Sequence, residues 1–254
     1  FDGDDVIDML LAKKETAQYI AQKIYVFFVN DTPNKEHVQW LADRFFKNNY
    51  DIQKLLDDIF TSDWFYAPQN IGCKIKSPVE LLIGIRRVLP MQIDYPAVQL
   101  LLTRAMGQLL FYPPNVAGWP GGKAWIDSTS LIFRMRLPQL IKDDDAIDIS
   151  VKSDDDVQMG KITATETQTF VRKKQAYGRG QQISANVNWE EYAEQFNGVP
   201  RENLQAVLES ILLVTPTQKA TTAVVAANTD ASSRLTFIQS TTIACMSTPE
   251  YQLC

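Results

Sequence analysis

Hydrophobic residues recur at three- and four-residue spacing through most of the first 141 residues, and this pattern predicts amphipathic helices. The longest such stripe, at about 14–29, puts Ala17, Ile20, Ile24, Phe27 and Phe28 on the core-facing side of one helix. The same spacing predicts further helices at about 5–11, 34–48, 51–59, 77–88, 95–110 and 128–137. We expect Pro138 to end the last of these, because proline lacks the N–H that a helix interior needs.

The strongest local signal for a helix start lies at Ser77. Serine is a good N-cap residue, and Pro78 suits the first helical position. Glu80 stands three residues after the cap, where its carboxylate can reach back to the cap N–H and complete a capping box. The helix is therefore predicted to begin immediately after Ser77.

The pattern changes after residue 141. Aspartates crowd the next stretch, and like charges at this density favour a solvated loop: they are Asp143, Asp144, Asp145, Asp148, Asp154, Asp155 and Asp156. Polar and apolar residues then alternate at 161–170 and at 181–189, with turn residues between them, which predicts a β-hairpin. Helical spacing returns at about 190–196, 202–213, 217–227 and 232–246.

Together these patterns predict a mainly α fold, a multi-helix globular domain with a small antiparallel β-hairpin insertion. We expect a single domain over residues 1–254. Its parts are a helical core at 1–141, the acidic loop and hairpin at 142–188, and C-terminal helices at 189–254. Hydrophobic residues make up 45% of the chain, enough for one large core or two small ones.

Prolines and glycines exclude regular structure from residues 111–126, yet this segment contains two tryptophans, which are mostly buried in proteins. We expect an ordered loop that packs on the helices, with the tryptophans as scaffold. On that interpretation, replacing Trp119 by alanine is strongly destabilising. The alternative is a small anion or sugar site, because backbone N–H groups of glycines beside a lysine can bind such ligands; its residues are Trp119, Gly121, Gly122, Lys123 and Trp125.

Two motif templates fit only in part. A phosphate-binding loop is disfavoured because Ala117 stands where its first glycine belongs and Ala124 where its hydroxyl residue belongs. Asp154 and Asp156 begin a calcium-loop pattern, but Met159 occupies the position of the invariant glycine. A solvated acidic loop is thus the favoured interpretation, with calcium at Asp154 and Asp156 as the alternative.

Composition narrows the function classes further. Lys and Arg number 25 against 30 Asp and Glu, a net charge of −5, which argues against nucleic-acid binding. No apolar run reaches the roughly 18–20 residues that a bilayer span needs. His37 is the one histidine, so His-based metal or acid–base chemistry has little basis, and we expect no cofactor. A disulfide from Cys73 to Cys245 or Cys254 stays open on spacing alone.

Several sequence blocks stand in a distinctive order: Phe27-Phe28-Val29, Ser62-Asp63-Trp64-Phe65-Tyr66, Lys76-Ser77-Pro78-Val79-Glu80-Leu81, Met106-Gly107-Gln108 and Phe111-Tyr112-Pro113-Pro114-Asn115-Val116-Ala117-Gly118-Trp119-Pro120-Gly121-Gly122. In these blocks, and over essentially its whole length, the chain resembles the C-terminal part of the bacterial domain-of-unknown-function 1800 family. Residues 247–254 also resemble the terminus of members from the Bacteroidetes.

The resemblance implies export to the periplasm or the cell surface. It also implies a longer parent protein whose N-terminal part is absent from this sequence. The partner it implies is a member of a second exported family, domain-of-unknown-function 1501. It implies no established reaction, and no catalytic residue can be carried over to this sequence.

We therefore expect a non-enzymatic exported protein that acts as a binding or assembly module at the cell envelope, for another surface protein or an envelope glycan. The absence of a Gly-x-Ser-x-Gly nucleophile motif from the sequence agrees with this expectation. The alternative is a hydrolase of cell-envelope material whose site is shared with the missing N-terminal portion.

Overall fold

The computed structural model describes residues 1–93, 96–143, 146–147, 181–182, 185–215 and 218–254. They form two compact units, Phe1–Lys74 and Ile75–Cys254, each with a hydrophobic core of its own. The apolar content of the chain is therefore divided between two cores. The single domain over residues 1–254 stays a prediction, and we describe each unit by itself.

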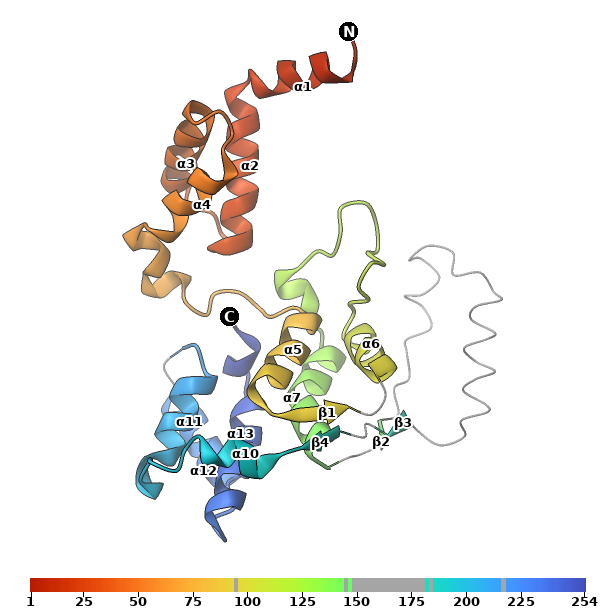
Figure 1. Ribbon diagram of the computed structural model, residues 1–254, viewed down its shortest axis with the longest axis vertical. Coiled ribbons are helices and arrows are strands. Elements are labelled where there is room, and N and C mark those ends of the chain that lie inside the picture. Colours follow the sequence, from red (N-terminus) through yellow and green to blue (C-terminus); the bar gives the residue numbers. More distant parts are fainter. Residues whose placement is uncertain (94–95, 144–145, 148–180, 183–184, 216–217) are drawn as a thin grey trace, which may run out of the picture. The chain divides into compact units, whose positions relative to one another are not determined.

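Helices make up most of the first unit (Figure 1). Its elements, in chain order, are α1 (Gly3–Leu11), α2 (Lys14–Phe28), α3 (Lys35–Lys47), α4 (Ile52–Phe60) and the 3-10 helices η1 (Asp63–Tyr66) and η2 (Pro68–Asn70). The predicted helices at 14–29 and 34–48 are confirmed to within a few residues. Their buried faces, together with that of α4, form the core of this unit.

The buried stripe of α2 differs in part from the predicted one. Ala17, Ala21, Tyr25 and the following Val29 are buried, at a constant spacing of four residues. Phe27 and Phe28 were expected to face the core, but Phe27 is 69% exposed and Phe28 is 37% exposed. Position 27 lies on the opposite side of the helix from this stripe, because 3.6 residues complete one turn.

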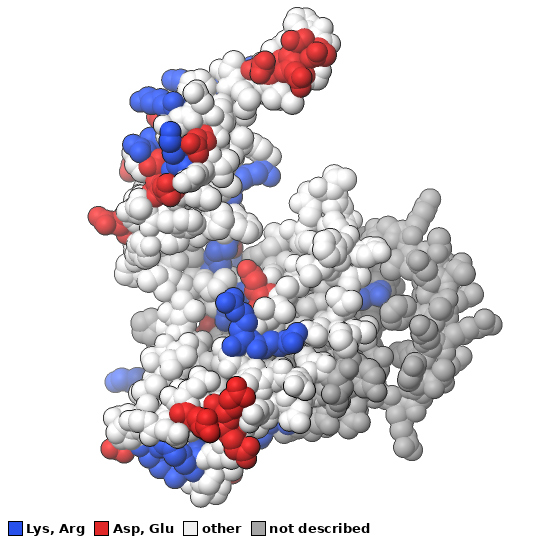
Figure 2. Space-filling view, in the orientation of Figure 1, with Lys and Arg blue, Asp and Glu red and all other residues white. Residues whose placement is uncertain are grey.

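The first helix, α1, carries an acidic N-terminus. Asp2 caps it, and the Asp2 N–H donates to the Asp5 carboxylate, which completes a capping box. Figure 2 shows acidic side chains gathered over this helix. Carboxylates at a helix N-terminus are favourable because they face the positive end of the helix dipole.

The second unit contains the remaining elements (Figure 1). In chain order they are α5 (Pro78–Val88), β1 (Met91–Ile93), α6 (Pro96–Ala105), η3 (Gly122–Trp125), α7 (Ser128–Asp143), β2 (Ala146–Ile147), β3 (Gln181–Gln182), β4 (Ala185–Val187), α10 (Trp189–Glu194), η4 (Arg201–Asn203), α11 (Leu204–Leu212), α12 (Lys219–Ala227), α13 (Arg234–Met246) and η5 (Glu250–Gln252). Helix α13 packs against α7, α10, α11 and α12, so it is the centre of this unit.

The fold class is confirmed, because the described residues are mainly helical with small antiparallel sheets. Strand β4 pairs with β1, with Met91 opposite Val187, and β3 pairs with β2. The predicted strand at 181–189 is thus present as β3 and β4. The predicted strand at 161–170 and most of the acidic loop lie outside the described residues.

Helix α7 corrects the expectation that Pro138 ends a helix, since it continues to Asp143. Leu137, Leu140 and Ile141 are all buried in the core of this unit. Burial of these side chains on both sides of the proline compensates for the backbone hydrogen bond that proline cannot donate. In the part of the chain that the structure describes, no helix is long and apolar enough to cross a membrane.

Candidate functional site

A pocket of about 320 Å³ lies in the first unit, where the loop between α2 and α3 meets η2. We call it the Asn34 pocket. Aromatic, amide, hydroxyl, imidazole and proline side chains line it, with no Asp, Glu, Lys or Arg among them: Tyr25, Asn30, Thr32, Pro33, Asn34, His37, Gln69 and Asn70. It is therefore a polar pocket without a fixed charge.

Asn30 ties the two sides of the Asn34 pocket together. Its Nδ2 donates to the Gln69 carbonyl oxygen at 3.2 Å and to Asn70 Oδ1 at 3.0 Å. Its Oδ1 accepts from the Thr32 N–H at 2.9 Å, an Asx-type turn that asparagine favours. Asn70 in turn donates from Nδ2 to the Trp64 carbonyl oxygen at 2.7 Å. This network holds the pocket walls in place without a ligand.

Asn34 uses its side-chain oxygen to cap a helix, while its side-chain nitrogen makes no hydrogen bond to the described residues. It is the N-cap of α3, and its Oδ1 accepts from the backbone N–H groups of Glu36 and His37 at 2.9 and 3.2 Å. Within the described ranges, no hydrogen-bond partner is found for its Nδ2, for the Thr32 hydroxyl or for the Gln69 side-chain amide. These groups are available to a ligand.

An aromatic stack supports the inner wall of the pocket. The Trp64 ring is stacked on His37, with ring centroids 4.4 Å apart, and on Tyr25, with centroids 5.7 Å apart. Burial raises the pKa of the Tyr25 phenol, and a backbone hydrogen bond from Asn34 partly offsets this. His37 Nδ1 is buried and has no hydrogen-bond partner among the described residues. The stack thus orients an imidazole that retains an unused nitrogen.

The lining of the Asn34 pocket is suited to hydrogen bonding with a neutral polar ligand. Amide and hydroxyl groups supply donors and acceptors, and the His37 imidazole adds two ring nitrogens. Ligand sites are typically small, pre-formed cavities in which a small number of polar groups converge.

The residues predicted for an anion or sugar site lie elsewhere, in and beside η3. Trp125 is buried, at 8% exposure, and its carbonyl oxygen accepts from the Ser130 hydroxyl at 3.1 Å. Trp119 is half-buried and Lys123 is exposed. Gly121 and Gly122 have positive φ angles of 71° and 52°, which glycine adopts without strain. Whether they bind a ligand stays a prediction.

The predicted calcium residues Asp154 and Asp156 lie outside the described residues. Where the chain is described, no group of three or more His, Cys, Asp or Glu side chains could hold a metal ion.

Cys73 and Cys245 carry free thiols, and the Cys73 thiol donates to the Val29 carbonyl oxygen at 3.2 Å. The disulfide that spacing left open is therefore not formed by Cys73.

Sequence reasoning missed the Asn34 pocket. It found little basis for chemistry at His37, because this is the one histidine of the chain. A signal was present, since three turn-forming residues, Asn30, Asp31 and Asn34, cluster directly before a helix that carries the one histidine. Nothing in that signal points to Gln69 and Asn70, which fold onto the loop from almost forty residues away.

One family model matches this chain, over residues 1–253, and its description is "Protein of unknown function (DUF1800)". No curated protein and no solved structure matches the chain. Because the family model covers nearly the whole sequence, the chain belongs to the DUF1800 family.

Proposed function

We propose that the chain is a non-enzymatic binding module and that its Asn34 pocket binds a glycan of the cell envelope. The single observation that carries this proposal is the chemistry of the pocket lining. The exposed side chains of Thr32, Asn34 and Gln69 help to line a polar pocket that has no acidic or basic residue other than His37.

Sugars match this lining because they are neutral and present several hydroxyl groups that both donate and accept hydrogen bonds. Asparagine and glutamine amides offer a donor and an acceptor side by side, which suits adjacent hydroxyls. The cavity volume of about 320 Å³ is at the lower end for ligand pockets, and it suits a single sugar unit of a longer chain.

Hydrolysis is the weaker candidate for this pocket. Glycoside hydrolysis usually needs a pair of Asp or Glu side chains on either side of the scissile bond. The lining of the Asn34 pocket contains neither residue type. A hydrolase of envelope material, the alternative function, would need catalytic groups from another part of the protein.

We further propose that this module acts after export, in the periplasm or at the surface of a Bacteroidetes-like bacterium, as the C-terminal part of a longer protein. The family resemblance supports this setting, and with it a domain-of-unknown-function 1501 protein as partner. Co-purification of the intact protein with that partner tests the assembly role. Absence of the partner from the purified complex would contradict it.

The glycan proposal is tested by calorimetric titration with soluble fragments of envelope polysaccharide. Asn34→Asp keeps the oxygen that caps α3 but replaces the unused Nδ2 donor by a charged oxygen, and we expect about tenfold weaker binding. Gln39→Ala, an exposed amide of α3 outside the pocket, is the matched control and should bind as the wild type does. Equal affinities of all three proteins would refute the site, and release of new reducing ends would favour the hydrolase.

A further inference from the structure

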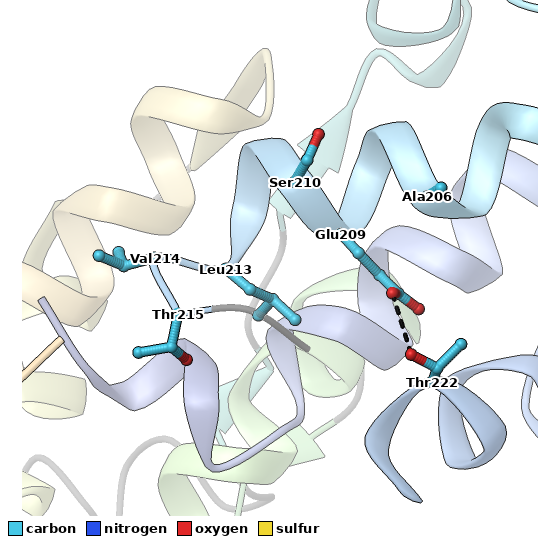
Figure 3. Close-up of a pocket in the computed structure, with 7 residues that line it drawn as sticks. All are labelled: Ala206, Glu209, Ser210, Leu213, Val214, Thr215 and Thr222. Carbon is cyan, nitrogen blue, oxygen red and sulfur yellow. Dashed lines mark hydrogen bonds between the residues drawn. The ribbon is translucent and has the colours of Figure 1, made fainter. Parts of the chain in front are cut away.

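A second cavity, of about 400 Å³, lies in the second unit between the end of α11 and α12. We call it the Glu209 pocket. One carboxylate, hydroxyl groups and aliphatic groups line it: Ala206, Glu209, Ser210, Leu213, Val214, Thr215 and Thr222. Figure 3 shows the Glu209 carboxylate pointing from α11 towards Thr222 of α12.

Glu209 is a buried acid without a cationic partner. Glu209 is only 6% exposed to solvent. One carboxylate oxygen accepts from Gln205 Nε2 at 2.8 Å, and the other accepts from the Thr222 hydroxyl at 3.2 Å. No salt bridge reaches Glu209 from any lysine, arginine or histidine that the structure describes. Two neutral donors only partly compensate for the loss of water around a charge.

The negative charge of Glu209 affects the Cys245 thiol on α13. Burial raises the pKa of the Cys245 thiol on α13, and the charge of Glu209 raises it further. Glu209 itself is buried, so water screens its carboxylate less than it screens one on the surface. A cation that entered the pocket would therefore be attracted strongly.

The rest of the lining indicates what kind of cation fits. Leu213, Val214 and Ala206 offer aliphatic surface beside the acid, and the Thr215 and Thr222 hydroxyls offer acceptor oxygens. Calcium is a poor match, because it takes six to eight oxygen ligands and usually several carboxylates. An ammonium group has three donors and tolerates an attached alkyl chain.

We propose that the Glu209 pocket binds a primary alkylammonium ion. The ammonium group donates to the Glu209 carboxylate and to a threonine hydroxyl, while the alkyl chain lies against Leu213. This site belongs to the second unit and is independent of glycan binding at the Asn34 pocket.

The test is the thermal unfolding of the whole chain with n-butylammonium chloride, n-butanol or an equal concentration of sodium chloride. We expect a saturable rise in Tm with n-butylammonium alone, because a ligand that binds only the folded state stabilises it. Equal effects of the amine and the alcohol, or of the amine and the sodium salt, would overturn the proposal without the use of any variant.

Two variants locate the site. Glu209→Gln removes the charge and should abolish the rise in Tm, while Glu250→Gln should retain it. Glu250 is the matched control, since it is a partly buried acid that accepts from Thr221 of the same α12 at 2.5 Å but does not line the pocket. Loss of the effect in Glu250→Gln alone would refute the assignment. If circular dichroism shows that Glu209→Gln is unfolded, Thr222→Val is used in its place. We expect Thr222→Val to bind the amine more weakly than the wild type does.

The outcome is separable from that of the proposed function. Asn34→Asp alters the pocket of the first unit and should leave the effect of n-butylammonium unchanged. A protein that binds the amine but no glycan would support this site while refuting the Asn34 pocket, and the reverse result would refute this site alone.

Discussion

Arg134 is completely buried in the second unit, and its guanidinium group holds the C-terminal residues beside the start of α5. Its Nε donates to Gln252 Oε1 at 3.1 Å, and its Nη2 donates to the Lys76 carbonyl oxygen. The Lys76 ammonium donates to the Tyr251 carbonyl oxygen at 2.7 Å and lies 4.0 Å from the centre of that ring. Burial lowers the pKa of Arg134 to about 10. Arginine tolerates this environment because it stays charged at neutral pH.

The two tryptophans of the segment 111–126 differ in burial, and their substitution should differ in cost. Trp125→Ala is expected to lower the free energy of unfolding by about 3–5 kcal/mol, because it empties a buried site. Trp119→Ala should cost clearly less, since its side chain is only half-buried. Urea unfolding of both variants measures this difference. An equal or larger loss for Trp119→Ala would contradict the structure and support the scaffold role that we predicted from the sequence.

Because of Cys245, we expect the free energy of unfolding to fall as the pH rises in the alkaline range. Burial first, and the charge of Glu209 second, raise the pKa of its thiol from 9.0 to about 12. Between these values the unfolded chain loses the thiol proton and the folded chain keeps it, so this contribution to stability is complete below pH 9 and is lost as the pH rises. The expected slope is about 1 kcal/mol per pH unit in this range.

Cys245→Ala removes this titrating group and should reduce that slope. Chemical unfolding at several pH values between 9 and 12 measures it for both proteins. The buried phenols of Tyr192 and Tyr251 also have raised pKa values, and they contribute a slope of the same sign in both proteins. Identical slopes would show that the Cys245 thiol is accessible to hydroxide in the folded chain.

At the scale of the elements, local signals predicted most helices but not all of their ends. The N-terminus of α5 follows the expected capping box, with the Ser77 N–H donating to Glu80 Oε2 at 2.7 Å. The end of α7 could not be predicted, because the cost of a proline within the helix is offset by packing with residues distant in sequence. Strand β4 was predicted correctly, but its partner β1 lies almost a hundred residues earlier.

The capping box of α5 gives a test at this scale. Ser77→Ala should lower the free energy of unfolding by about 1 kcal/mol, because it leaves the Glu80 N–H without its side-chain acceptor. Glu80→Gln retains an acceptor for the Ser77 N–H and should cost less. Thermal unfolding compares the two variants. A neutral effect of Ser77→Ala would mean that water replaces the cap at no cost.

At the scale of the whole molecule, the two units carry pockets of different chemistry. The Asn34 pocket has neutral amide and hydroxyl groups, and the Glu209 pocket has one buried acid. Neither was predicted from the sequence. The Asn34 pocket forms where the loop after α2 meets η2, almost forty residues later, and periodicity within one segment carries no information about such a meeting. The Glu209 pocket lies between the consecutive helices α11 and α12, and its cavity depends on how these two helices pack.

His37 provides the most direct measurement of the central claim, that the Asn34 pocket binds an envelope glycan. The chain has one histidine, so the imidazole signals in an NMR spectrum belong to His37. We predict that soluble glycan fragments shift these signals with the same Kd that calorimetry gives, and that n-butylammonium leaves them unchanged. Saturating glycan binding by calorimetry with unchanged imidazole signals, or no glycan binding at all, would contradict the account.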